Sequence, residues 1–174
     1  MNALGRIFDI GLGWAPVDLN TADGATGKRI SMNGATGITF VVATGVGGAD
    51  DIVLDVQQHT AYTGGTSGDL DVVTKFWLKA ETALDNDESW VAITQSIASE
   101  CTIVGATYGT QQKLCVIEVD AAQLSDGYTH VSLVATCVTS TAQLGVCLYF
   151  LHDLAVQRIP SALPNLLNPG AANV

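Results

Sequence analysis

Hydrophobic and polar residues alternate along residues 37–58, and a turn rich in glycine and aspartate interrupts the pattern. In an extended chain, successive side chains point to opposite sides, so every second residue shares a face. One side receives three large apolar residues before the turn and three after it: Ile38, Phe40, Val42, Ile52, Leu54 and Val56. The pattern predicts a β-hairpin built for packing and pairing, and it carries no catalytic motif.

Strand-like segments recur at short spacing through the rest of the central region. They are separated by turn residues rather than by helical intervals, and with the first two strands they make about eight: 72–80, 90–94, 101–108, 113–119, 128–137 and 144–151. A single helical turn is expected after Asp120, which can cap it. Short strands without intervening helices are typical of an antiparallel sandwich or barrel. The sequence therefore predicts an all-β fold.

The segment 144–151 is apolar on both of its faces. An antiparallel sheet normally leaves one face in contact with water, so a strand of this kind needs a cover on its outer side. We expect either the N-terminal region or a neighbouring subunit to supply that cover.

The chain divides into a β-domain at 37–158 with a different kind of segment at each end. Residues 1–36 mix glycines with small apolar clusters, and we interpret them as an N-terminal arm ordered against another surface. Residues 159–174 carry three prolines and no charged side chain, which predicts an extended C-terminal tail. The candidate contact residues are the large apolar side chains of these two ends: Leu4, Ile7, Phe8, Trp14, Leu163, Leu166 and Leu167.

Composition narrows the classes of function. The chain has 174 residues, of which 48% are hydrophobic, so one domain with a real core is expected. A net charge of −10 argues against nucleic-acid binding, which relies on basic residues. No apolar run is long enough for a signal peptide or a membrane span, so we expect neither secretion by the general route nor contact with a membrane. The four cysteines are widely spaced, which favours reduced core residues made in a cytosol.

Motifs for chemistry are weak. Residues 24–28 resemble part of a phosphate-binding loop, but Ala22 and Arg29 stand where glycine and a hydroxyl residue are required. The acidic run 85–89 resembles the start of a calcium-binding loop, but Trp90 replaces its glycine, so a solvated turn is favoured. The three histidines lie far apart in sequence and favour structural roles: His59, His130 and His152. We therefore expect that the protein is not an enzyme and that it has neither a metal site nor a cofactor.

Three blocks of the chain resemble the decoration, or cement, proteins of tailed bacteriophage capsids. They are GITFVVATGVGGADDIVLDVQQ at 37–58, KFWLKAETALDNDESWVAIT at 75–94, and the long block at 113–153 that contains IEVDAAQL. The resemblance implies a jelly-roll-like β-sandwich that sits on the outer capsid surface as a homodimer or homotrimer. It would bridge neighbouring copies of the major capsid protein and stabilise the head. The protein would be made in the host cytoplasm and end in the virion.

Two alternatives remain open at this stage. A β-sandwich can also be a carbohydrate-binding module, and the chain has aromatic residues that could line a sugar site: Trp14, Trp77, Trp90, Tyr62, Tyr108, Tyr128 and Tyr149. The same fold would also suit a tail or head-fibre subunit of a phage. Packing is the more ordinary role for such aromatic residues.

Overall fold

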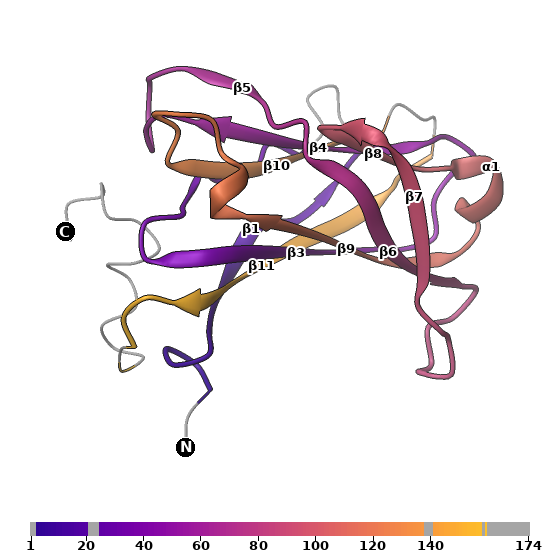
Figure 1. Ribbon diagram of the computed structural model, residues 1–174. Coiled ribbons are helices and arrows are strands. Elements are labelled where there is room, and N and C mark those ends of the chain that lie inside the picture. Colours follow the sequence, from indigo (N-terminus) through magenta and orange to yellow (C-terminus); the bar gives the residue numbers. More distant parts are fainter. Residues whose placement is uncertain (1–2, 21–24, 138–140, 158, 160–174) are drawn as a thin grey trace.

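A computed structural model describes residues 3–20, 25–137, 141–157 and 159 of the chain. The described residues form two antiparallel β-sheets packed as a sandwich, with one short α-helix, α1 (Gly105–Tyr108), and one 3-10 turn, η1 (Ala121–Gln123) (Figure 1). The all-β sandwich expected from the strand pattern is therefore confirmed. The helical turn expected after Asp120 is η1, where the Asp120 side chain takes part in a capping box.

The larger sheet has six strands. In spatial order they are β1 (Phe8–Asp18), β11 (Leu144–Leu154), β3 (Ala35–Thr44), β9 (Gln112–Asp120), β6 (Val73–Glu81) and β7 (Val91–Ala98).

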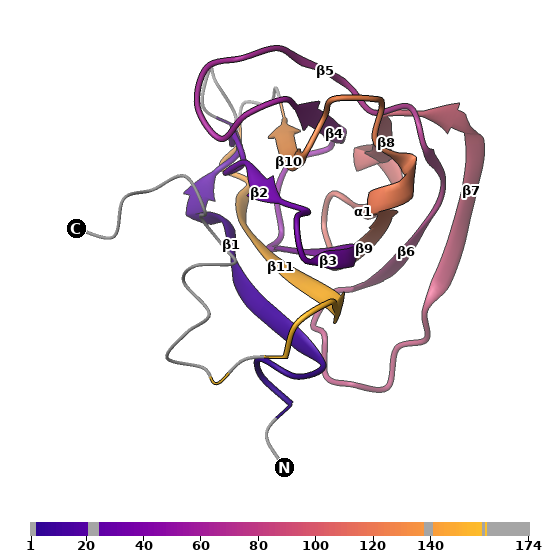
Figure 2. The ribbon, with the colours of Figure 1, turned by 60° about the vertical axis from the view of Figure 1, so that its left-hand side comes forward.

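The smaller sheet has five strands. Four follow the order β2 (Ile30–Ser31), β10 (His130–Thr136), β4 (Ile52–His59) and β5 (Ser67–Asp69), and β8 (Glu100–Ile103) also pairs with β4. In Figure 2 the layer containing β4 and β10 lies above the layer containing β11, β3 and β9. The strands number more than the expected eight because β1 and the short strands β2 and β5 were not foreseen.

The strand pairs are nested along the chain. Strand β3 pairs with the last strand, β11; β4 pairs with β10; and β6 pairs with β9, all antiparallel. The segment β7–β8 lies at the centre of this nesting. Such an arrangement is a long hairpin wound into the two layers of the sandwich.

The two strands of segment 37–58 pack together, but they do not pair with each other. The structure places β3 in the six-stranded sheet and β4 in the five-stranded sheet, so the expected hairpin is wrong. Their apolar sides face each other across the core, where Phe40 and Leu54 have no exposed surface. Alternation predicts which side of a strand is buried, but it does not distinguish a neighbour in the sheet from a partner in the opposite layer.

The N-terminal region belongs largely to the sandwich. Strand β1 pairs along β11, so residue 36 does not separate an arm from the β-domain. Glycines make this docking possible, because a Cβ atom at Gly11 would clash with the Tyr149 side chain and one at Gly13 with the Cys147 sulfur. In the segment that we interpreted as an ordered arm, Gly11 and Gly13 are therefore the positions over which side chains of β11 fit.

Candidate interaction surface

A row of apolar side chains crosses the outer side of the whole six-stranded sheet. Its members are partners in register on adjacent strands, one from each: Leu12, Leu148, Val41, Val116, Trp77 and Ala92. Their sequence neighbours point into the core, because side chains alternate along each strand. The row therefore lies on the face that the sandwich itself does not cover.

Two neighbouring rows widen this surface. The additional apolar side chains that share it are Ile10, Phe150, Val146, Ala43 and Leu114, again in register with one another or with Thr39 and Lys79. We call these eleven residues of the three rows the apolar face. Among them Leu12 is 40% exposed and Ile10 36% exposed. Glu118 is the one carboxylate that the register places within the rows, opposite Thr39.

The apolar face is hollowed near β6 and β7. A shallow cavity of about 250 Å³ is lined by Trp77, Trp90 and Val116. The ammonium group of Lys75 lies 4.6 Å from the centre of the Trp77 ring, and that of Lys79 lies 5.2 Å from the centre of the Trp90 ring. Because lysine stems are apolar, they extend the aromatic surface and leave the charges at its rim.

The outer side of the five-stranded sheet is polar and bonded within itself. The His59 ring is 3% exposed and is held between two hydroxyl groups, with 2.8 Å from Nδ1 to Ser67 Oγ and 2.8 Å from Nε2 to Ser132 Oγ. Arg29 donates to the same Ser67 oxygen at 3.0 Å. Burial, and then the positive charge of Arg29 and the neighbouring His130, lower the pKa of His59 to about 4. The ring is therefore neutral at pH 7 and links three strands.

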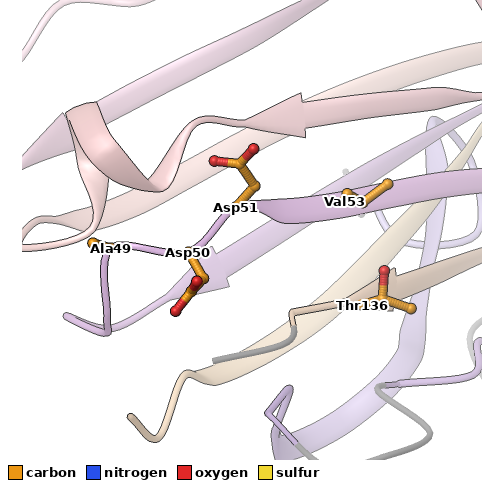
Figure 3. A pocket seen from close by; sticks show the side chains of 5 residues that line it. All are labelled: Ala49, Asp50, Asp51, Val53 and Thr136. Atoms are coloured by element: carbon orange, nitrogen blue, oxygen red, sulfur yellow. The ribbon is translucent and has the colours of Figure 1, made fainter. Parts of the chain in front are cut away.

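A hollow on this second side is lined by acidic and hydroxyl side chains. Its volume is about 440 Å³, and it is bordered by Ala49, Asp50, Asp51, Val53 and Thr136 (Figure 3). Asp51 accepts a hydrogen bond from the backbone N–H of Gly105 at 2.8 Å. Figure 3 shows the two carboxylates pointing in opposite directions, so they do not converge on one ligand.

The acidic turn between β6 and β7 gathers four carboxylates: Glu81, Asp85, Asp87 and Glu88. Their oxygens lie within 4.8 Å of one another, and three of the four residues are exposed. The negative charge of Asp87, above all, raises the pKa of Glu81. Mutual repulsion of this kind is expected of a solvated acidic loop, which agrees with the interpretation of segment 85–89 as a turn.

The cysteine and histidine side chains that could serve as nucleophiles or bases are buried or hydrogen-bonded within the fold. All four cysteines are buried free thiols, as expected for reduced core residues: Cys101, Cys115, Cys137 and Cys147. Burial raises the pKa of the Cys147 thiol, which suppresses the reactive thiolate. His59 and His130, distant in sequence, are direct cross-strand partners, a proximity that their spacing did not reveal. Their environment is a structural hydrogen-bond network rather than an open cleft.

The structure separates the contact residues predicted at the N-terminus. Phe8 extends the apolar face, where its ring meets Phe150 edge-on at 5.6 Å between centroids. Ile7 is 61% exposed beside it, and Leu4 is half-buried and forms a bridge to Phe8. The structure corrects the prediction for Trp14, because this side chain is 4% exposed and packs in the core, where it cannot anchor a partner. The residues predicted in the C-terminal tail lie outside the described residues: Leu163, Leu166 and Leu167.

Most of the apolar face was not foreseen as a contact surface. The sequence signal that could have found it is the apolar character of both sides of a strand, which was noticed only for segment 144–151. Strand β3 carries the same signal, because Val41 and Ala43 alternate with the buried Phe40 and Val42. The predicted need for a cover over β11 thus extends across the sheet.

Comparison with known proteins adds no relative, since no protein-family model, curated protein or solved structure matches the chain. Within the described residues, no helix has the length and apolar character needed to cross a membrane. The features that bear on function are therefore the fold, the two outer sides of the sandwich and the resemblance of the three sequence blocks.

Proposed function

We propose that the protein is a structural component of a phage virion that binds the outer surface of the capsid. In this role it cross-links neighbouring copies of the major capsid protein and stabilises the head. The observation that carries the proposal is the apolar face, which spans six strands on one side of a sandwich whose other side is polar. Such one-sided character suits a subunit that attaches to a surface by one side and meets solvent with the other.

The extent of the apolar face supports attachment to a protein. Five spacings between adjacent strands give a width of about 24 Å. Contiguous apolar patches of several hundred Å² on a soluble domain commonly mark contacts with another macromolecule. The side chains of the face are held on regular strands, so little conformational entropy is lost when a partner covers them.

Charge and rigidity support the same role. The chain carries a net charge of −10, and the register places one carboxylate, Glu118, within the three rows of the apolar face. Apart from the buried Asp9, the other acidic side chains of the described residues would face solvent and keep unattached copies soluble. A rigid sandwich that contacts two capsid subunits at once gains avidity, so moderate individual contacts can produce stable cross-links.

The proposal is tested by placing a charge at the centre of each outer side. Val41→Glu alters the apolar face on β3, and Val53→Glu is the matched control, a half-buried valine on the outer side of β4. Binding would be measured by co-sedimentation with undecorated capsids of the phage that encodes the chain. We expect Val41→Glu to weaken binding by at least about tenfold, because a buried carboxylate would lack a partner.

Val53→Glu should bind like the wild type. Equal binding by all three proteins, with circular dichroism confirming that each is folded, would contradict attachment through the apolar face. Deleting residues 1–20 is not a clean alternative, since the deletion removes β1 from the sheet and mixes folding with attachment.

A carbohydrate-binding module is the second candidate, and one observation favours it. Trp77 and Trp90 come together at the hollow in the apolar face, and Trp90 is 43% exposed. Aromatic rings of this kind can stack on a sugar ring. A glycan array separates the two functions: a defined saccharide preference that is lost in Trp90→Ala would favour the carbohydrate-binding module, whereas no preference would favour the capsid protein.

A further inference from the structure

The edges of the two sheets are protected to very different degrees. An edge strand presents unpaired backbone N–H and C=O groups, and natural proteins limit unwanted pairing with charges, prolines, bulges or short strands. The five-stranded sheet follows this rule, because its edge strands β2, β5 and β8 contain only two, three and four residues.

The β1 edge of the six-stranded sheet is also protected. Its register shifts twice, between Leu12 and Trp14 and between Trp14 and Val17. Pro16 lacks a backbone donor, and the outer edge is partly used, since the N–H of Lys28 donates to the Gly13 carbonyl at 2.9 Å. A second chain would find few regular, free backbone groups along this strand.

Strand β7, at the opposite edge, has little such protection. Its eight residues, VAITQSIA, include no charged residue, no proline and no glycine. Val91 is 53% exposed and Ile97 is 64% exposed. Within the part of the chain that the structure describes, β7 pairs only with β6, and Figure 1 shows it at the rim of the fold. The register with β6 shifts once, between Val73↔Ala98 and Lys75↔Thr94, so β7 carries a bulge after Thr94, whereas residues 91–94 pair regularly with β6.

We propose that β7 pairs antiparallel with β7 of a second copy, so that the two six-stranded sheets become one continuous sheet. A second copy is the occupant that the charges favour, because two chains of net charge −10 can approach closely only through uncharged segments. An antiparallel pair of identical strands also satisfies twofold symmetry, the commonest symmetry of protein dimers.

The regular part of β7 limits the register of this pairing. Residues 91–94 pair one for one with four consecutive residues of β6, whereas the bulge disturbs β7 beyond Thr94. A second copy would therefore pair along residues 91–94, where Val91 is 53% exposed. Directly opposed residues of an antiparallel pair lie on the same side of the sheet, and their side-chain contacts stabilise it.

The dimer would have a consequence for attachment. Its twofold axis is perpendicular to the joined sheet, so both apolar faces lie on the same side. The surface available to a partner then doubles and can contact two neighbouring capsid subunits. This consequence rests on the proposed function, whereas the pairing of β7 does not, and it can be tested on the purified protein alone.

The test compares two double variants with equal added charge. V91K/I97K places two lysines on the β7 edge, where they would repel those of a second copy. V46K/L144K is the control, because Val46 is 51% and Leu144 62% exposed and neither lies on β7. We expect sedimentation equilibrium at micromolar concentration to give wild type and control at twice the 18.1-kDa chain mass. The β7 variant should show a dimer dissociation constant raised by about tenfold or more.

Three results would overturn the proposal: a monomeric wild type, a β7 variant that dimerises as well as the wild type, or equal loss of dimer in the control. Because these measurements contain no capsid, they leave the attachment experiment independent.

Discussion

The two outer sides of the sandwich cover the same core but differ in the side chains that they carry: one is polar and the other is apolar. On the five-stranded side, buried polar groups bond to one another, with His59 joining Ser67 and Ser132. On the six-stranded side, apolar side chains such as Leu148 and Val41 lie in register and half-buried on adjacent strands. The first side holds His59 by bonds within the chain and leaves Asp55 Oδ1 and His130 Nε2 buried without a hydrogen-bond partner. The second side would gain stabilisation from a partner that covers it.

Because of this difference, substitutions on the two sides should affect different properties, namely the stability of the fold on one side and attachment to a partner on the other. A substitution that removes a member of the polar network leaves buried groups without hydrogen bonds, so its cost appears in folding. A polar substitution on the apolar face removes little that the folded chain needs, so its cost should appear in binding. The predictions below use this separation.

The largest expected effect on stability comes from the network. His59→Ala leaves the Ser132 and Ser67 hydroxyls without their shared partner, and it should lower the free energy of unfolding by about 2 kcal/mol. Val134→Ala, on the same strand as Ser132 but outside these bonds, is the control and should cost less. Urea denaturation measures both. Equal stabilities of His59→Ala and wild type would show that the polar side is not held by this network.

A smaller effect on stability is expected when the pH is lowered. The folded-state pKa of His59 is about 4, below its ordinary value of 6.5, because burial disfavours the charged ring. Between these values the unfolded state binds the proton more readily, so this residue's contribution to stability is lost as pH falls from about 6.5 to 4. The pKa of His130 is lowered in the same sense, and that of Asp9 is raised, which acts in the opposite sense.

The contribution of His59 to stability is therefore measured as the difference in urea midpoint between the wild type and a variant without this histidine. Urea midpoints of wild type and His59→Gln, measured across this pH range, should converge as the pH falls. Parallel curves would mean that His59 does not couple protonation to folding.

The smallest effect on stability is expected on the apolar face. Val41→Ser should change the free energy of unfolding by about 1 kcal/mol or less, because the side chain is only half-buried. The same variant should bind less of a fluorescent dye that reports exposed apolar surface, whereas Val53→Ser on the other side should leave dye binding unchanged. Equal dye signals from both variants would remove the distinction between the two sides.

The sequence predicted the class of fold because inward positions follow a strict two-residue period. Ile38, Phe40 and Val42 are all buried as expected. It did not predict how the strands are distributed between sheets, since β3 and β4 bury their apolar sides equally well as neighbours or as partners across the core. That choice depends on contacts between distant segments, such as β3 with β11.

The contact surface was predictable only in part. The doubly apolar strand 144–151 indicated that an outer side needs a cover, and Phe8, one of the predicted contact residues, lies half-buried on the side that the structure shows to be apolar. Trp14 was misplaced because β1 was not recognised as a strand; Gly11 and Gly13 resemble a flexible linker until the side chains beneath them are known. The sequence shows that residues 91–98 carry no charged side chain, but it does not show that they form an edge strand of the sheet.

The most direct test of the central claim is hydroxyl-radical footprinting of the protein free and bound to capsids, because it measures both outer sides in one experiment. The account predicts that oxidation of Leu12, Leu148 and Trp77 falls on binding, while oxidation of Val53 and Val134 is unchanged. Protection of Val53 and Val134, with the apolar face as reactive as in the free protein, would contradict attachment through the six-stranded sheet.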